Sequence, residues 1–274
     1  MLTLENVSYR YAGALRPSLR EVTMTLRDGE IVGVVGPSEA GKSTLCLVAA
    51  GLAPRTVGGS LTGRTLLDGA ESMSLAMYEM AARIGIGFEN PGTQLSGVTV
   101  TVYEEVAFGP MNLGVARGEV VARTEAALRT LHIEDLSARD PARLSGGQQQ
   151  LVAIAGLLAM APAHLVLDEP TAQLDPAGTQ LVSAAITTLA RSGRSILIAE
   201  HKTDLLASVC DRVVALESGR VVLEGAAGAV LGDPRLRELG VSEPSAIRIR
   251  RLAAESGLRS GILEEALAAP ATSL

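Results

Sequence analysis

A glycine-rich loop at residues 36–44 is the first feature of this sequence that could do chemistry. It reads GPSEAGKST, fits the pattern G-x-x-x-x-G-K-[ST], follows a predicted strand and opens a predicted helix. In such a loop, backbone N–H groups surround phosphate oxygens, and the helix N-terminus adds partial positive charge. Lys42 is expected to reach the β- and γ-phosphates, and the Ser43 hydroxyl to ligate Mg²⁺. The expected nucleotide-binding residues of this loop are Gly36, Pro37, Ser38, Glu39, Ala40, Gly41, Lys42, Ser43 and Thr44.

Two acidic residues follow a second apolar run. Asp168 and Glu169 come directly after Leu165-Val166-Leu167. Because Mg²⁺ keeps several waters and takes few protein oxygens, Asp168 beside the phosphate loop is suited to hold it directly or through water. Glu169 points elsewhere, which suits a group that polarises the attacking water. We therefore predict a metal ligand at Asp168 and a catalytic base at Glu169.

A histidine ends the third apolar run, at residues 196–199. A lone histidine is more often structural, but His201 falls at the same sheet edge as the phosphate loop and the acidic pair. This position favours contact between His201 and the γ-phosphate. Glu200 beside it is interpreted either as a supporting group behind the site or as a surface residue.

An aromatic ring that stacks on adenine is expected shortly before the phosphate loop. Tyr9 and Tyr11 are the candidates, and two-residue alternation along a strand places both on one face. Spacing alone does not choose between them.

Alternating strands and helices must position these residues. The first thirty residues alternate apolar and polar positions, as half-buried antiparallel strands do, whereas residues 31–35 form a continuous apolar run typical of a strand covered on both faces. The alternation predicts a parallel α/β sheet with ligands at the carboxyl ends of its strands. The segment 92–140 reads as mostly helical and is interpreted as an insertion. Helices are predicted at 45–50, 115–131, 147–160 and 176–190, and two short ones near 245–256 and 262–268.

Composition limits the possible functions. The chain has 274 residues, of which 24 are basic and 30 are acidic. Its net charge of −6 does not indicate the basic surface that nucleic-acid binding requires. Its two cysteines form no disulfide framework and suit a reducing cytosol, and no signal peptide is evident. The run 151–167 lacks Asp, Glu, Lys and Arg, but Pro162 and His164 interrupt it. We interpret it as a buried helix followed by a buried strand, and expect any membrane role to come through a partner.

A second glycine-rich turn, Leu144-Ser145-Gly146-Gly147-Gln148, lies about a hundred residues after the phosphate loop. Together with the other motifs it resembles the signature of ATP-binding-cassette (ABC) ATPases, and the resemblance covers residues 1 to about 225. Phe88-Glu89-Asn90-Pro91 resembles the Q-loop, Leu174-Asp175 resembles the D-loop, and His201 stands at the switch histidine. The resemblance places Tyr11 beside adenine and Glu89 beside the metal. It implies a head-to-tail dimer in which the signature of one chain acts on the ATP of the other.

Further stretches resemble the ATPase of energy-coupling-factor (ECF) importers, which bring vitamins or transition-metal ions into prokaryotic cells. These stretches are 88–94, 101–114 and 152–160, and the tail after Pro244 is similar to the small C-terminal helical domain of those ATPases. The resemblance implies an ABC ATPase domain at 1–230, with an antiparallel β subdomain and a helical subdomain at about 92–160, and a helical domain at 231–274. It also implies ATP and Mg²⁺, a second ATPase subunit (the same chain or a paralogue), a transmembrane coupling protein and a membrane substrate-binding protein. The chain would then lie peripherally on the cytoplasmic face of the cell membrane.

Three positions depart from the family pattern. Glu89 replaces the Q-loop glutamine, Leu151 stands where arginine is frequent, and Gln173 stands where a small residue is frequent. Glu89 is expected to keep binding Mg²⁺ but to change the hydrolysis rate or the metal dependence, and Leu151 to alter packing. Two other functions stay open: the ATPase of a conventional binding-protein-dependent importer, and a soluble ABC protein that uses ATP-driven dimerisation as a switch.

Overall fold

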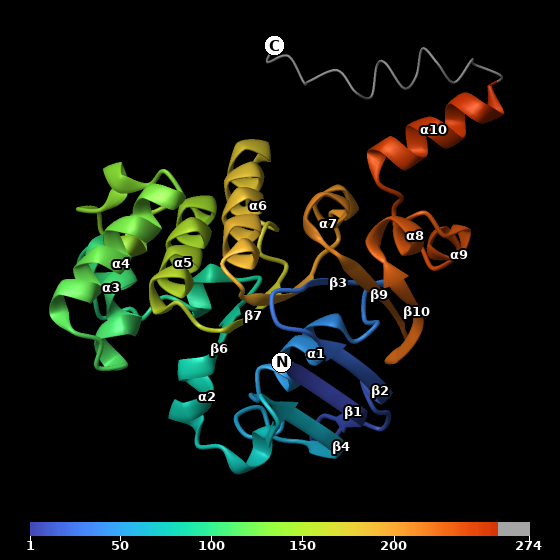
Figure 1. Ribbon diagram of the computed structural model, residues 1–274, viewed down its shortest axis with the longest axis horizontal. Helices are drawn as coiled ribbons and strands as arrows, with labels where there is room; N and C mark the ends of the chain where they lie inside the picture. The colour runs from blue at the N-terminus through green and yellow to red at the C-terminus, as the bar shows by residue number, and fades with distance from the viewer. Residues whose placement is uncertain (257–274) are drawn as a thin grey trace.

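The computed structural model describes residues 1–256 of the chain, and its centre is a six-stranded sheet (Figure 1). The strand order is β10-β9-β3-β8-β7-β6. Five strands run parallel, and β10 pairs antiparallel with β9. The sequence predicted β3, β7 and β8 but not the other three strands. The strands are β3 (Ile31–Val35), β6 (Ile84–Gly87), β7 (His164–Asp168), β8 (Ser195–Ala199), β9 (Arg212–Glu217) and β10 (Arg220–Ala226).

A second sheet of four antiparallel strands contains the N-terminal residues and has the order β2-β1-β4-β5. Burial alternates along its first strand, as the alternation of apolar and polar residues predicts. The predicted antiparallel β subdomain is therefore present. Its strands are β1 (Leu2–Arg10), β2 (Leu19–Leu26), β4 (Ser60–Leu67) and β5 (Ala70–Glu71).

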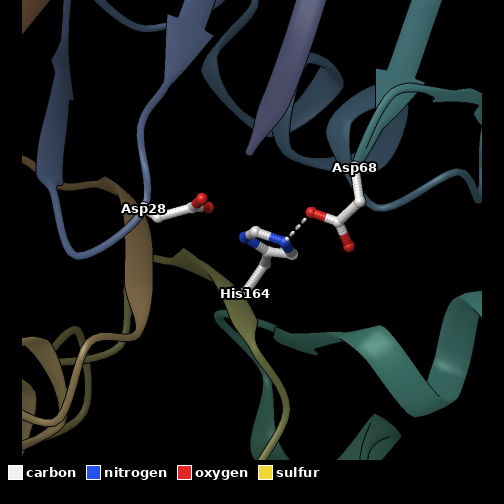
Figure 2. Close-up of side chains that lie close together, drawn as sticks. All are labelled: Asp28, Asp68 and His164. Atoms are coloured by element: carbon white, nitrogen blue, oxygen red, sulfur yellow. Dashed lines mark hydrogen bonds and ion pairs between the residues drawn. The ribbon is translucent and has the colours of Figure 1, made fainter.

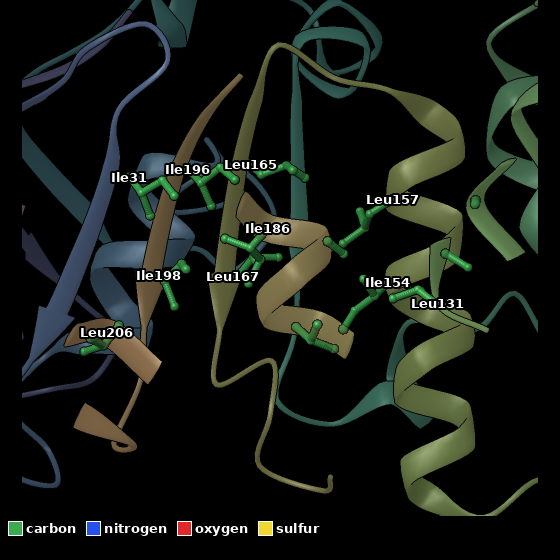
Figure 3. Close-up of a cluster of buried hydrophobic side chains, with 14 of the residues drawn as sticks. Ile31, Leu131, Ile154, Leu157, Leu165, Leu167, Ile186, Ile196, Ile198 and Leu206 are labelled. Carbon is green, nitrogen blue, oxygen red and sulfur yellow. The ribbon is translucent and has the colours of Figure 1, made fainter. Parts of the chain in front are cut away.

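The central sheet is buried on both faces, which explains its continuous apolar strands. Ile31, Leu165 and Ile196 point to the face covered by α5 and α6 (Figure 3). Their neighbours along the strands, Val32 and Leu197, belong to the second core, which is shared with α1 and the antiparallel sheet. Because successive side chains of a strand point to opposite faces of the sheet, neighbouring residues of one strand belong to different cores.

Three helices form a group on the β6 side of the central sheet, and α5 is the one that also packs on the sheet (Figure 1). They are α3 (Val102–Asn112), α4 (Arg117–Thr130) and α5 (Gly146–Met160), and each contacts the other two. Capping boxes start two of them: Thr101 accepts from Glu104 N–H, and Ser145 accepts from Gln148 N–H. Helices α3 and α4 lie within the segment 92–140 that the sequence predicts as a helical insertion, and α5 lies within the helical subdomain at about 92–160 that the resemblance implies.

The remaining helices cover the central sheet or follow it. Helix α5 and strand β7 divide the apolar run 151–167 as the sequence predicts. Within residues 1–256, no helix combines the length and the apolarity that a membrane span requires. The predicted helix at 262–268 lies outside the described residues. The helices are α1 (Lys42–Ala49), α2 (Met77–Arg83), α6 (Pro176–Arg191), α7 (Thr203–Val209), α8 (Ala227–Leu231), α9 (Pro234–Glu238) and α10 (Ser245–Glu255), with 3-10 turns at Ser72–Ser74, Pro91–Thr93, Glu134–Leu136 and Pro141–Arg143.

Candidate nucleotide-binding site

The loop between β3 and α1 requires glycine at two positions. Gly36 has φ 154° and Gly41 has φ 105°. A Cβ on Gly36 would lie 2.3 Å from the carbonyl oxygen of Leu216, and one on Gly41 would lie 2.6 Å from that of Ser18. Both contacts are with backbone atoms, which cannot move aside as a flexible side chain can. The two glycines therefore let the loop curl closely over the sheet edge and start helix α1.

A cavity of about 330 Å³ opens above this loop. Lys42 is buried, and its Nζ donates to the carbonyl oxygens of Gly36, at 3.0 Å, and Pro37, at 3.1 Å. The structure thus brings the predicted phosphate-binding residues together with Glu169 and His201. The cavity is lined by Ser18, Ser38, Glu39, Gly41, Lys42, Ser43, Thr44, Glu169 and His201.

The two acidic residues at the end of β7, Asp168 and Glu169, have different surroundings. Asp168 is buried, and its Oδ1 has no hydrogen-bond partner within residues 1–256. An unpaired buried carboxylate oxygen is costly unless a cation completes it, and Ser43 lies close enough to hydrogen-bond the same side chain. Oxygen ligands of this kind suit Mg²⁺. The residues present therefore fit the expected metal.

Glu169 faces the histidine from the next strand. Its Oε1 lies 2.9 Å from His201 Nε2. The backbone of Glu169 has φ 49°, an unusual value for a residue with a side chain, and its N–H donates to the carbonyl oxygen of Ala199 on β8 at 2.8 Å. Such backbone strain persists where the surroundings enforce it. The turn after β7 thus aims the carboxylate at His201 and into the cavity.

Burial and crowding of charges shift the pKa values of the site. Burial raises the pKa of Asp168, the hydrogen bond from Ser43 opposes this, and the charge of Glu89 adds to it. Burial also raises the pKa of Glu169, where His201 opposes the change and Glu89 reinforces it. Burial lowers the pKa of Lys42 against the opposing carboxylates. The charge of Glu89 therefore acts on both acidic residues.

The two candidate aromatic residues differ in accessibility. Tyr9 is fully buried, and its hydroxyl donates to the carbonyl oxygen of Gly58 at 2.6 Å. Tyr11 lies past the end of β1, is partly exposed, and its hydroxyl lies 3.1 Å from Thr44 Oγ1. A buried ring has no free face for a base. The geometry therefore favours Tyr11 over Tyr9 as the adenine contact.

The predicted signature and D-loop do not line this cavity. They lie against each other instead: a Cβ on Gly146 would lie 2.3 Å from the side-chain Oε1 of Gln173, and one on Gly147 would lie 3.1 Å from its carbonyl oxygen. The Asp175 side chain caps α6 by accepting from Gly178 N–H at 2.7 Å. Gln173, for which the sequence offered no account, thus packs on the N-terminus of the signature helix.

Glu200 is not a surface residue. Only 2% of it is exposed, so the surface alternative is wrong and the supporting position behind the site is the observed one. The signal in the sequence for this buried position is that Glu200 directly follows an apolar strand and directly precedes His201.

A second group of potential metal ligands lies on the N-terminal side of β7. The ligand atoms of Asp28, Asp68 and His164 lie within 4.8 Å of one another (Figure 2). The α-ammonium of Met1 donates to both carboxylates, and His164 also contacts Ser195 Oγ at 3.0 Å. The positive charge of this ammonium therefore offsets part of the negative charge of the two acids. The group joins the two sheets, and we assign no metal to it.

An apolar groove of about 310 Å³ lies between β6 and the helical group. Its walls include Leu95 and Phe108, and Phe108 is 38% exposed. Val98 and Val100 in the adjoining loop are each 71% exposed. Leu95, in contrast, is partly buried against the core. An apolar groove with exposed apolar side chains beside it is a candidate binding surface.

Comparison with known proteins gives consistent results. The family model described as ABC transporter matches residues 19–172. The cobalt import ATP-binding protein CbiO of Rhodobacter capsulatus is 38% identical over 280 residues, which cover 98% of this chain and 96% of that protein. The energy-coupling factor transporter ATP-binding protein EcfA of Methanosarcina acetivorans is 37% identical over 251 residues, covering 91% and 88%.

Two solved structures agree in fold. CbiO1 from Clostridium perfringens, described as part of the ABC transporter complex CbiONQ, has a TM-score of 0.73 and 31% identity, covering 91% of this chain and 98% of that one. A dimeric post-hydrolysis state of the ATP-binding cassette MJ0796 bound to ADP and Pi also has a TM-score of 0.73, with 26% identity and coverage of 83% and 99%.

Proposed function

This chain belongs to the ABC transporter family of ATP-binding proteins, and from that membership we propose that it is the ATPase subunit of an ECF-type importer. It is an ATP-hydrolysing component of an ABC importer. The finer assignment rests on the full-length likeness to CbiO and EcfA proteins, which extends past the matched family segment into the tail. The solute would be a vitamin or a transition-metal ion, and it is recognised elsewhere in the complex. We place the chain peripherally on the cytoplasmic face of the membrane.

In the proposed reaction, Lys42 and the loop 36–44 hold the phosphates, and Tyr11 stacks on adenine. Asp168, Ser43 and Glu89 would hold Mg²⁺, which neutralises charge on the β- and γ-phosphates. Glu169 orients and deprotonates the attacking water. The N–H at His201 Nε2, the atom that now faces Glu169, would donate a hydrogen bond to the γ-phosphate when ATP is bound. Of these groups, Lys42, Ser43, Glu169 and His201 line the cavity described above, whereas Tyr11, Asp168, Glu89 and the loop residues Gly36, Pro37 and Ala40 do not.

The signature residues Leu144, Ser145, Gly146, Gly147 and Gln148 would act on the ATP of a second subunit, and Leu174 and Asp175 would meet that subunit beside them. Their absence from this chain's own cavity supports the arrangement. The N-terminus of α5 offers backbone N–H groups and a favourable dipole to an incoming γ-phosphate. The dimeric form of the similar MJ0796 cassette supports pairing of two such chains.

We expect Glu89→Gln to change the metal dependence of hydrolysis. The substitution removes one negative charge from a site where that charge raises the pKa of Asp168 and Glu169. The Mg²⁺ concentration for half-maximal activity should rise by about three- to tenfold, since a neutral amide attracts the cation less strongly. A titration of ATPase activity with Mg²⁺ measures this shift. Equal Mg²⁺ affinity and equal turnover in the variant would remove the proposed role of Glu89.

The partner proteins provide the direct test of ECF-type function. A tagged chain, extracted from its own membranes in mild detergent, should bring down a transmembrane coupling protein, a membrane substrate-binding protein and a second ATPase. Two transmembrane subunits accompanied by an extracytoplasmic binding protein would indicate a conventional importer. A soluble complex without membrane proteins would indicate a dimerisation switch.

The same extraction tests the groove between β6 and the helical group as the docking surface. Phe108→Glu should reduce recovery of the membrane partner at least tenfold, because a charge in an apolar groove loses water without gaining a partner. ATP binding by the isolated subunit should stay unchanged. The matched control is Val222→Glu, since Val222 is equally exposed, at 39%, but lies on β10 at the opposite edge of the sheet. Equal losses in both variants would contradict docking in the groove.

A further inference from the structure

Glu200 is a buried carboxylate for which the proposed reaction has no use. It follows the last residue of β8 and directly precedes His201. Its backbone N–H donates to the carbonyl oxygen of Val34 on β3 at 3.2 Å, so the residue is still anchored to the sheet. A carboxylate that is 98% buried is costly unless hydrogen bonds compensate its lost hydration.

Three hydrogen bonds compensate this burial, and they come from two different loops. Oε1 accepts from the backbone N–H of His201 at 2.9 Å and of Lys202 at 3.1 Å. Oε2 accepts from the hydroxyl of Thr171 at 2.7 Å. Thr171 itself is fully buried, in the turn that leads from the acidic pair towards the D-loop. One side chain thus fixes the main chain of the switch histidine to the stem of the D-loop.

Lys202 makes a second connection between the same two loops. Its Nζ donates to the carbonyl oxygen of Thr171 at 2.8 Å and to the Thr179 hydroxyl, in the first turns of α6, at 3.2 Å. The residues on either side of His201 therefore both hold the segment that starts at Thr171. Gln173 in that segment packs on Gly146 at the start of the signature helix. A continuous set of contacts runs from the signature to the Glu169–His201 pair within one chain.

We propose that Glu200 is a positioning residue for ATP hydrolysis, which holds the His201 loop against the D-loop stem through Thr171. Its carboxylate fixes the backbone from which His201 reaches Glu169. The inference rests on the proposed role of His201 in the reaction. Because the D-loop and the signature are proposed to meet the second subunit, the same bonds connect dimer contact with the geometry of the hydrolytic pair. Hydrogen-bond networks between rigid elements are one of the physical routes by which two sites can be coupled.

The sharpest test removes one hydroxyl. Thr171→Val keeps the size and branching of the side chain but leaves Glu200 Oε2 without its donor. In the full-length chain we expect kcat to fall about 5- to 50-fold, which is less than the roughly 10²-fold that a 1 Å misplacement of a catalytic group can cost, while the Kd for ATP stays within about twofold. Thr171→Ser keeps the hydroxyl and should restore most of the rate. Glu200→Ala, if it folds, should lose at least as much as Thr171→Val.

Thr124→Val is the matched control. Thr124 is also fully buried, in α4, and its Oγ1 has no hydrogen-bond partner in the described part of the chain. This variant should retain the wild-type kcat. An equal loss of kcat in both threonine variants would mean that burying valine merely disturbs the core, which would overturn the inference. A thermal melt of each variant checks that the chains compared are folded.

The effect must also pass through His201. In a His201→Ala chain, which is itself expected to be slow, adding Thr171→Val should lower kcat no further. If Thr171→Val lowers kcat by the same factor in the His201→Ala chain as in the wild type, Thr171 acts independently of His201. The positioning role of Glu200 would then be wrong, while the proposed role of His201 would stand. An unchanged kcat in His201→Ala by itself would overturn both the proposed role of His201 and the inference built on it. An unchanged kcat in Thr171→Val, beside a slow His201→Ala chain, would overturn the positioning role only.

Discussion

A Glu169→Gln chain is expected to bind ATP normally and to hydrolyse it roughly 10²- to 10⁴-fold more slowly, the contribution typical of a positioned general base. Glutamine keeps the shape of the side chain and can keep the contact with His201 that now measures 2.9 Å. It cannot take a proton from water. Because burial raises the pKa of Glu169, the wild-type carboxylate is also a stronger base than an exposed one. The loss should therefore appear in kcat and not in ATP affinity.

Two measurements separate this role from a structural one. Single-turnover hydrolysis gives the rate of the chemical step, and light scattering with ATP gives the dimer population. The slow variant should accumulate as an ATP-bound dimer, since the dimer no longer dissociates through hydrolysis of its ATP. Glu217→Gln, at the exposed end of β9, serves as the control and should behave as wild type. Residual hydrolysis within tenfold of wild type would assign the base to another residue.

The sequence predicted the convergence of the candidate site residues better than it predicted their surroundings. Lys42, Glu169 and His201 end or follow apolar strands, and parallel strands bring such residues to one edge, so their convergence could be expected from order alone. Strands β6, β9 and β10 escaped prediction. A short strand is defined mainly by the strand that it pairs with, which can be distant in sequence. Strand β6, for example, has only four residues, and two of them are glycines.

Side-chain contacts between loops were beyond sequence reasoning. Tyr9 and Tyr11 share strand periodicity, and only packing against Gly58 shows that the first is buried. From the sequence alone, Glu200 could equally be a surface acid. Only the structure shows that the hydroxyl of Thr171, 29 residues earlier in the chain, donates to it. Gln173 acquires a role only when the start of α5 is seen against it. Each case depends on which loops fold together, and periodicity carries no information about that.

Two inactive variants, when mixed, are expected to recover activity if the signature serves a neighbouring subunit. Lys42→Ala removes the phosphate-binding ammonium. Gly147→Asp places a carboxylate where the γ-phosphate would approach, although an acid in the first turn favours the helix itself. Alone, each chain should hydrolyse ATP at least about 10²-fold more slowly than wild type, since Lys42→Ala loses an attractive contact with the transferred phosphate and Gly147→Asp adds a repulsive one.

In a head-to-tail mixed dimer both lesions fall in the same composite site, and the other site is intact. Half of the dimers formed by random pairing of equal amounts are mixed, so about one quarter of the wild-type sites should be active. A mixture of Lys42→Ala with Glu169→Gln is the control. Both residues line the same cavity, so each site of that mixed dimer keeps one lesion and no activity should return. If the first mixture also stays inactive while mixed dimers form, the signature does not act across the interface, and the two-chain site would have to be abandoned.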